Sequence, residues 1–399
     1  MAIYNTAPTH MDLFSRIMAE KFHAKNKVRK NMGFLSFFGN EANGGESRFT
    51  NDALSVDIDI VKDNTVISAL TTRGANPTLN QKQTQGAKAS TTSRVFPISS
   101  ETGAITAVET YHRQMGEMPY QPKSQYERYR EIAASIFDDK IRAQMWLFEQ
   151  LASESILEGT MKTDEFGNGF DFKRDADNKV NAATPWTDSA SKPLEDIDSL
   201  CTLVDRNGYA EPDFVGMDKA SYTAFINHAS VKEMADNRRY NIVMVGDNST
   251  VKPESKYDRH IKAGWSPRAY LTTDGGYSVW IFTYNSWYRN ASEVKTDFIP
   301  KGTVFAISSE ARFDRYFGPS DKLPSVLSTS SVLEQTFGIE SAFVDAFENG
   351  GSSIIDPRQF HFYAFNNGND SAINLEVQTA PIYACTQVDA VATMKLTVV

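Results

Sequence analysis

The sequence has 399 residues, 41% of them hydrophobic, which is enough to bury a sizeable core in about two or three lobes. Its formal net charge of -9 argues against nucleic acid as a direct partner of the whole surface. Two distant cysteines exclude a disulfide scaffold, and the lack of any apolar run of about 18 residues leads us to expect no membrane partner.

Residues 1–50 are predicted to form an N-terminal arm rather than a domain, because apolar residues are sparse there. A short amphipathic helix is expected over Asp12–Phe22, from the helical spacing of its apolar side chains. A basic run at 25–33 and a glycine-rich break at 39–47 follow it. An arm of this composition has to pack against something else to become ordered.

Residues 51–110 are predicted to form an extended β-hairpin loop. In its first strand, Leu54, Val56, Ile58 and Ile60 alternate with polar residues, as in a strand with one buried face. A second strand candidate follows a long polar excursion. Strand periodicity is therefore clear at the base of the hairpin and fades towards its tip.

The polar excursion, Thr71–Arg94, has Leu79 as its one large apolar residue and contains no acidic residue. It carries a charge of +4, so the remainder of the chain carries -9 - 4 = -13. We expect its cations to contact an acidic surface on an adjacent molecule, and the alternative is a solvated, flexible loop. The four predicted contact residues are Arg73, Lys82, Lys88 and Arg94.

The strongest helix signal covers residues 124–161. Ser124 and Glu127 form a capping-box pattern at its start, and Gly159 falls near its end. Apolar residues recur three or four apart in one stripe, which predicts a helix roughly 55 Å long that lies across a sheet. A coiled coil is the alternative, but no heptad is sustained. The stripe consists of Tyr129, Ala133, Phe137, Ile141, Met145, Phe148, Ala152 and Ile156.

A polar connector at 163–186 leads into a predicted α/β segment. Cys201 and Cys385 both fall in apolar-periodic stretches and are predicted to be small core residues. The end of the chain is rich in strand signals, and Pro381 is predicted to lie at a sheet edge or bulge. We expect helices at 193–209 and 219–239, strands at 212–218, 277–285 and 302–309, irregular structure at 241–275, and leave 319–358 unassigned.

The sequence contains no glycine-rich phosphate loop, nucleophile elbow, CxxC pair or histidine pair at helical spacing. Residues 175–178, "DADN", begin like a calcium loop, but Lys179 and Val180 stand where a ligand and a glycine are needed. We therefore predict no enzyme activity, no cofactor and no metal site.

Two further patterns have both a structural and a functional interpretation. Asp57 and Asp59 share the outward face of a strand, which fits a general acid/base pair or a solvated sheet face. The aromatic stretch Tyr277–Tyr288, with Trp280 and Trp287, fits a sugar or base platform or a strand with half of its rings in the core. We expect the structural interpretation in both cases.

The order of these parts resembles the major capsid proteins of tailed phages, and most closely the lambda-type major capsid protein E family. The resemblance rests on an ordered set of stretches rather than on one diagnostic motif. These are "TTRGA", "PYQPKSQYERYREIAASI" running on to "SESILEGTMKTDEFG", "DFVGMDKASYTAFINHASVKEMADNRR", "IPKGTVFAISSEARFDRYFGP" and "LEVQTAPIYACTQVDAVATMKL".

The resemblance implies an α+β protein with the tailed-phage/herpesvirus major capsid fold, of the Hong Kong 97 type. It implies that the hairpin lies over a neighbouring subunit and that the helix at 124–161 is the spine of a peripheral domain. The implied boundaries are an arm at 1–50, a hairpin loop at 51–110, a peripheral domain at 111–189, an axial domain at 190–369 and further peripheral strands at 370–399.

The implied function is that of a major head protein, which assembles as hexamers and pentamers into an icosahedral shell around double-stranded DNA. The implied partners are other copies of the chain, a portal protein, and DNA held without sequence-specific binding, and the presence of a decoration protein stays open. Residues 1–50 are too short for a fused scaffolding segment, so a separate scaffolding protein is expected. Assembly is expected in the host cytoplasm, with the virion capsid as the final location.

Several alternatives stay open at the level of sequence. Some relatives link subunits covalently between lysine and asparagine, and Lys82 or Lys88 could serve if a buried carboxylate lay nearby. A protein nanocompartment shell of the same fold would enclose an enzyme instead of a genome. A carbohydrate-binding or adhesion protein would use the rings near Trp280 and Trp287, and no residue set marks a hydrolase.

Overall fold

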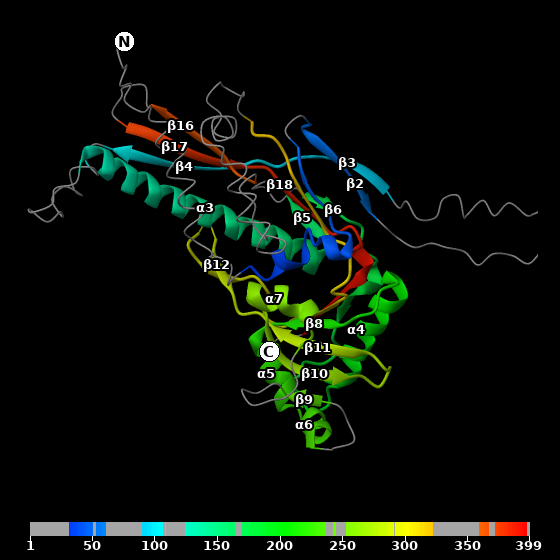
Figure 1. The fold of residues 1–399 in the computed structure, drawn as a ribbon. Helices are drawn as coiled ribbons and strands as arrows, with labels where there is room; N and C mark the ends of the chain where they lie inside the picture. The colour runs from blue at the N-terminus through cyan, green and yellow to red at the C-terminus, as the bar shows by residue number, and fades with distance from the viewer. Residues whose placement is uncertain are drawn as a thin grey trace, which may run out of the picture.

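The computed structural model describes most of the chain, and its elements appear in Figure 1. Within the described residues, no helix combines the length and the apolar character needed to cross a membrane. The described ranges are 32–50, 53–60, 90–106, 108, 124–163, 169–236, 242–244, 253–290, 292–321, 359–366 and 372–396.

The long helix α3 (Gln125–Glu158) confirms the predicted spine helix and begins directly after Ser124. It ends before Gly159, whose φ of 66° is readily adopted only by glycine, so the chain can turn there. Of the predicted stripe, Ile141 is half-buried, and Tyr129 lies outside the described side chains. The buried members are Ala133, Phe137, Met145, Phe148, Ala152 and Ile156.

The helix packs along a three-stranded antiparallel sheet, and the two run side by side in Figure 1. This arrangement matches the prediction of one long helix lying across a sheet. The strands are β16 (His361–Asn366), β17 (Ala372–Thr379) and β4 (Ser99–Thr106). Residues 359–366 were expected in the axial domain, but β16 pairs with β17, so this strand belongs with the spine helix.

The base of the predicted hairpin is a two-stranded antiparallel ribbon of β2 (Ser55–Ile60) and β3 (Ser90–Val95). Val56, Ile58 and Ile60 are buried as the alternation predicted. The prediction was wrong for Leu54, whose side chain is 72% exposed because the ribbon starts one residue later. The prediction was wrong for the second strand, which was expected after the polar stretch. The strand that pairs with β2 is β3, at the end of that stretch, and the expected strand is β4, which pairs with β17 instead.

A mixed seven-stranded sheet forms the second half of the molecule. Residues 241–275 were expected to be irregular, but they supply two of its strands and a helix, because a register shift between Pro267 and Ala269 hides the alternation. In order across the sheet, the strands are β7 (Lys179–Asn181), β19 (Val391–Lys395), β14 (Thr303–Ile307), β8 (Phe214–Met217), β11 (Ser278–Thr283), β10 (Ser266–Thr272) and β9 (Ile242–Met244). The helices are α4 (Pro193–Gly208), α5 (Lys219–Asn227), α6 (Ala229–Asp236) and α7 (Asp258–Ala263).

A third sheet joins the arm to the end of the chain. In it, β1 (Ser47–Phe49) runs parallel to β15 (Asp314–Phe317), which pairs on its other side with β18 (Pro381–Ala384). Pro381 therefore stands on an edge strand, as predicted. Residues 370–399 were all expected in peripheral strands, but β19 pairs with β14 and belongs to the seven-stranded sheet.

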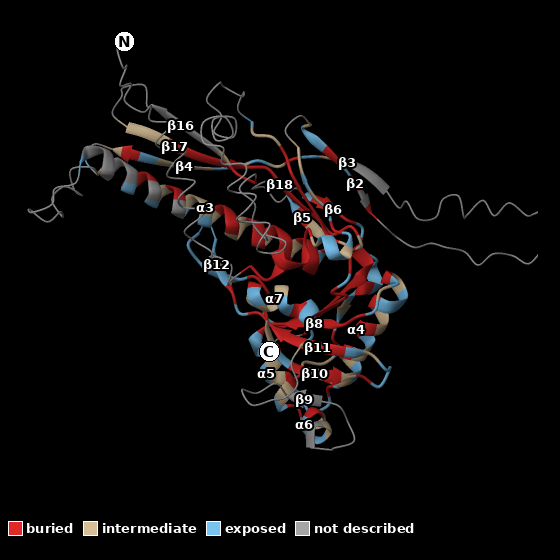
Figure 2. Cartoon of the chain, in the orientation of Figure 1, coloured by how far each residue is buried: buried red, intermediate tan, exposed pale blue. Residues whose placement is uncertain are grey.

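The seven-stranded sheet separates two clusters of buried side chains, coloured red in Figure 2. Alternation along each strand sends Phe214, Phe282 and Phe305 towards the cluster that contains the stripe of α3. Val215 and Ile281 point to the opposite face, which α4 covers. Both cysteines are free and buried, as predicted.

The described part of the arm, residues 32–50, packs into the first of these clusters. A short 3₁₀ turn, η2 (Phe34–Phe37), is buried between α3 and α7, and a second turn, η3 (Glu41–Asn43), leads towards β1. The expectation that the arm leans on the rest of the molecule is thus confirmed for these residues. Shorter elements complete the described part of the chain: β5 (Thr160–Lys162), β6 (Gly169–Asp171), η4 (Ala176–Asn178), η5 (Ser255–Tyr257), β12 (Trp287–Arg289), β13 (Lys295–Asp297) and η7 (Val388–Ala390).

Candidate subunit contact surfaces

Of the four predicted contact cations, Arg94 alone lies within the described residues, at the root of the β2–β3 ribbon. Its guanidinium carbon lies 5.0 Å from the centre of the Phe170 ring, so this cation already packs against its own chain. Arg73, Lys82 and Lys88 lie outside the described residues, so a common surface for the four stays a prediction.

The same ribbon root exposes large apolar side chains. Leu54 is 72% exposed, Val95 is 70% exposed, and Ile98 is also open to solvent. Val95 stands opposite Ser55, on the face of the ribbon that carries Asp57. Grouped apolar side chains of this kind typically mark a contact with another molecule, so the root is a candidate interface.

The arm is attached to the spine helix through a buried carboxylate. Glu149 has no exposed surface, and its two oxygens accept the backbone N–H groups of Phe34 and Leu35 at 2.8 and 3.0 Å. The hydroxyl of Tyr284 donates to the same carboxylate at 2.8 Å and accepts from the N–H of Gly33 at 3.2 Å. One acidic side chain thus satisfies the free N–H groups at the start of η2.

Burial dominates the ionisation of this cluster. It raises the pKa of Glu149 to about 7, despite the donors that favour the charged form. On the other side of η2, His260 is buried with its Nδ1 atom 2.6 Å from the Ser36 hydroxyl, and its ring lies 4.3 Å from that of Phe37. Burial lowers the pKa of His260 to about 3, so this histidine is neutral at physiological pH.

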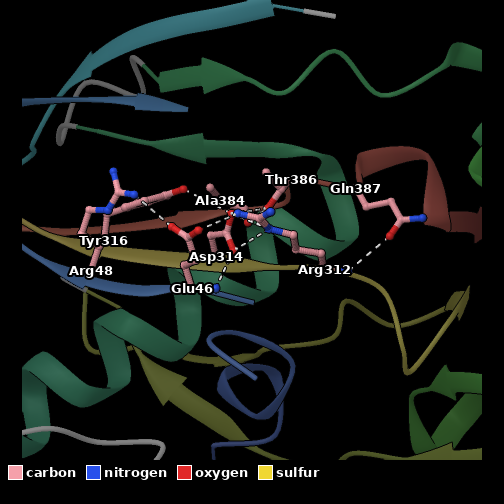
Figure 3. A network of polar contacts seen from close by, with 8 residues as sticks. All are labelled: Glu46, Arg48, Arg312, Asp314, Tyr316, Ala384, Thr386 and Gln387. Atoms are coloured by element: carbon pink, nitrogen blue, oxygen red, sulfur yellow. Dashed lines mark hydrogen bonds and ion pairs between the residues drawn. The ribbon is translucent and has the colours of Figure 1, made fainter. Parts of the chain in front are cut away.

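A second buried carboxylate holds the third sheet together (Figure 3). Asp314 accepts the N–H of Glu46 at 2.7 Å, the hydroxyl of Thr386 at 3.0 Å and the hydroxyl of Tyr316 at 3.2 Å. Arg312 forms an ion pair with Asp314 at 3.1 Å and reaches Glu46 at 3.3 Å. The arm, β15 and the end of the chain therefore converge on one side chain.

The end of the spine helix is capped by a buried arginine. The guanidinium of Arg174 donates to the carbonyl oxygens of Ile156 at 2.7 Å, Leu157 at 3.2 Å and Ser155 at 3.4 Å. It also donates at 3.2 Å to the carbonyl of Val388, which leads into β19. A cation at a helix C-terminus complements the helix dipole, so Arg174 joins the spine helix to the seven-stranded sheet.

The calcium-like pattern and one of the two tryptophans of the aromatic stretch have structural roles. Asp175 accepts the N–H of Asp177 within a turn, and the side chain of Asn178 donates to the carbonyls of Asp389 and Val391. Trp280 is buried in the core. Among the described residues, no cluster of histidine, cysteine and carboxylate side chains could hold a metal ion.

Glu149, Asp314 and Arg174 were not predicted from the sequence to be contact residues. Glu149 carries a detectable signal, because it lies four residues after Met145 and beside Phe148, inside the apolar stripe. Asp314 and Arg174 have no such local signal, since their partners come from distant parts of the chain.

A cavity of about 830 Å³ lies beside α5 and is lined by Trp186, Asp218 and Lys301, among others. Asp218 is engaged as the cap of α5, because its carboxylate accepts the N–H groups of Ala220 and Ser221. The cavity thus offers no free carboxylate from this residue for acid or base chemistry.

The sequence model of the family described as phage major capsid protein E matches residues 44–330 of the chain. Among solved structures, the chain is similar to a prophage protein of E. coli CFT073 described as a capsid protein, with a TM-score of 0.59 and 13% identity over 96% of this chain and 98% of that one. No curated protein sequence matches the chain.

Two further structures are more distant. A chain of the bacteriophage PhiM1 mature capsid has 9% identity and a TM-score of 0.44, over 91% of this chain and 87% of that one. The SrpI encapsulin of Synechococcus elongatus PCC 7942 has 12% identity and a TM-score of 0.41, over 87% and 84%. Because both TM-scores lie below 0.5, the fold assignment depends on the prophage protein.

The predicted α+β class and the Hong Kong 97-type capsid fold are confirmed by this likeness and by the observed mixture of helices and sheets. The family match in turn confirms the predicted role as a phage major capsid protein, a structural component of the virion head. Since the matched residues span more than half of the sequence, the chain belongs to the phage major capsid protein E family.

Proposed function

We propose that this protein assembles as hexamers and pentamers into the icosahedral shell of a tailed-phage head, around a double-stranded DNA genome. The family match over residues 44–330 carries the proposal. The β2–β3 ribbon supports it, because the exposed apolar side chains of Leu54 and Val95 at its root are left for a second molecule to cover.

In the proposed shell, the polar stretch Thr71–Arg94 lies on a neighbouring subunit. Arg73, Lys82, Lys88 and Arg94 dock there on an acidic surface, in keeping with their charge of +4 against -13 for the rest of the chain. A loop on one copy and an acceptor on the next form a heterologous contact, which closes into rings. Several such contacts per subunit hold a shell together even where each is weak.

The proposed domain division follows the sequence expectation, with four strands moved by their pairing. The arm is 1–50 and the hairpin is 51–110 without β4. The peripheral domain is 111–189 without β7, together with β4, β16, β17 and β18, and the axial domain is the remaining part of 190–369 together with β7 and β19. Arg174 and Glu149 lie where these units meet.

We further propose a separate scaffolding protein during assembly, a portal protein at one vertex and a decoration protein on the shell. The packaged DNA is held without sequence-specific contacts, as fits a chain of net charge -9. Assembly takes place in the host cytoplasm, and the protein itself catalyses no reaction.

Electron microscopy of the purified, concentrated protein in negative stain tests the proposal. We expect uniform icosahedral shells, or hexameric and pentameric rings. A protein that stays monomeric and monodisperse at high concentration, alone and with its scaffolding protein, would contradict it.

Charge reversal tests the loop contact. Because Arg94 packs on Phe170, the variant R73E/K82E/K88E is preferred to one that changes all four cations. We expect a folded, soluble subunit that forms no shells. The control K179E/K192E/K232E reverses three exposed cations outside the hairpin and is expected to assemble. Normal shells from the loop variant at both low and high salt would refute the contact.

A further inference from the structure

The ribbon of β12 and β13 presents an aromatic ring and two cations on its outward face. The strands pair Trp287 with Asp297 and Arg289 with Lys295, so these four side chains share one face. All four are exposed, and β12 is drawn in pale blue beside α3 in Figure 2. Trp287 is 42% exposed, which is unusual for the largest apolar side chain.

The opposite face of the ribbon is fixed to the body of the molecule. The ring of Tyr288 lies 4.9 Å from that of Phe298, which is buried in the main cluster. Burial raises the pKa of Tyr288, and the charge of Glu154 on the spine helix adds to this effect. The ribbon is therefore anchored beside the end of α3.

The turn that joins the two strands is held in one conformation. The side-chain oxygen of Asn290 accepts the N–H groups of Ser292 and Val294, both at 3.0 Å, and its backbone carbonyl accepts that of Glu293 at 2.9 Å. Glu293 adopts a φ of 58°, in the left-handed region. Val294 is thus presented to solvent, 57% exposed, on a pre-ordered support that loses little entropy on binding.

The cations of the ribbon form no ion pair within the described residues, although Asp297 lies on the same face. Arg289 and Lys295 stand directly opposite each other, an arrangement of like charges that is unfavourable unless an anion lies between them. The Lys295 ammonium lies 4.5 Å from the centre of the Trp287 ring. No ion pair joins either cation to a carboxylate of the described chain.

We propose that the face formed by Trp287, Arg289, Lys295 and Asp297 is a contact surface for a second copy of this chain, which supplies carboxylates to the two cations. This inference rests on the proposed shell function. A second copy fits because a chain of net charge -9 offers an acidic surface to its neighbours, and because the face combines an exposed apolar centre with a polar rim.

A sugar-binding role for the same ring is disfavoured by its surroundings. A stacking platform needs flat aromatic faces, but Lys295 covers one face of Trp287. Trp280, the other tryptophan of this stretch, is buried, and Tyr288 faces inward on Phe298. The aromatic residues of this stretch therefore include rings that pack in the core, such as Trp280, and one exposed ring, Trp287, which we assign to the contact with a second copy.

The test compares assembly of W287A and R289E/K295E with wild type and with K179E/K232E, which reverses two exposed lysines elsewhere. Circular dichroism monitors folding, and sedimentation measures the assembled fraction at one protein concentration. We expect both ribbon variants to lose about tenfold in assembled fraction and the control to keep it. The inference is overturned if the ribbon variants assemble like wild type, or if the control loses as much. Failure of wild type itself to assemble would instead refute the shell function.

A second measurement does not depend on the folding of these variants. A photo-reactive p-benzoyl-phenylalanine at position 287 is incorporated into shells made from mixed ¹⁴N and ¹⁵N chains. We expect cross-linked peptides of mixed label, with an acidic segment of the chain as the partner. Cross-links confined to one chain, cross-links to a different protein, or none in assembled shells would each overturn the inference.

Discussion

Glu149 and His260 hold the same turn of the arm from opposite sides, and they respond to pH in opposite directions. Burial raises the pKa of Glu149 from 4.5 to about 7, so its contribution to stability falls as pH rises through that window. Burial lowers the pKa of His260 from 6.5 to about 3, so its contribution is lost as pH falls through that window. Between about pH 4.5 and 6.5 the two effects offset each other. The other titratable groups that face Glu149 are Tyr284 and Tyr383.

The first prediction concerns Glu149→Gln in the unassembled subunit. The variant lacks the carboxyl that binds a proton on folding, so the His260 effect is no longer offset. Between pH 7.5 and 4.5, its free energy of unfolding should fall by about 3 kcal/mol more than that of wild type. Urea unfolding at several pH values measures this difference.

Glu158→Gln is the matched control for that experiment, because Glu158 lies on the same helix but is exposed. Its pH profile should run parallel to that of wild type. Parallel profiles for Glu149→Gln and wild type would show that the buried carboxyl does not bind a proton on folding.

At the scale of elements, the spine helix depends on the cap at its end as well as on its apolar stripe. The second prediction is that Arg174→Met destabilises the protein by about 3 kcal/mol or more, because several buried carbonyl groups lose their donor. Lys179→Ala, an exposed cation of the same segment, should change stability by less than about 0.5 kcal/mol. Equal stability of the two variants in urea unfolding would argue against the cap.

Elements with a strong local pattern were predictable from the sequence. The stripe from Ala133 to Ile156 repeats for many turns, so the spine helix was identified nearly to its ends. Alternation likewise identified β2, α4 ended at Gly208 as expected, and the strand signals at 277–285 and 302–309 became β11 and β14.

Pairing between distant segments was not predictable in the same way. β19 reads as a strand, but nothing in its residues specifies β14 as its partner, more than 80 residues away along the chain. The buried polar contacts share this limit: Asp314 depends on Glu46 and Thr386, which local pattern cannot connect. The four-cation surface and the domain boundaries stay predictions.

At the scale of the molecule, the arm connects the two halves of the fold. The Phe34 ring packs edge-on against Trp265 at 5.4 Å and contacts Phe305 of the seven-stranded sheet at 5.9 Å, while its N–H binds Glu149 of the spine helix. Phe38, at the end of the same turn, packs against Tyr383 of the third sheet at 5.3 Å. This one segment thus contacts the seven-stranded sheet, the third sheet and the spine helix that packs on the three-stranded sheet.

The third prediction follows from that shared contact and concerns Phe34→Ala. The substitution leaves a cavity where α3 and the seven-stranded sheet meet, which should lower stability by about 3–5 kcal/mol. Because both halves lose packing together, calorimetry of the unassembled subunit should show one transition at a lower temperature, not two. Leu54→Ala removes an exposed apolar side chain and should shift the transition little. Two separate transitions in Phe34→Ala would mean that the halves fold independently and that the arm only lies between them. A single transition at a lower temperature would mean that residues 32–38 couple the folding of the spine helix to that of the seven-stranded sheet.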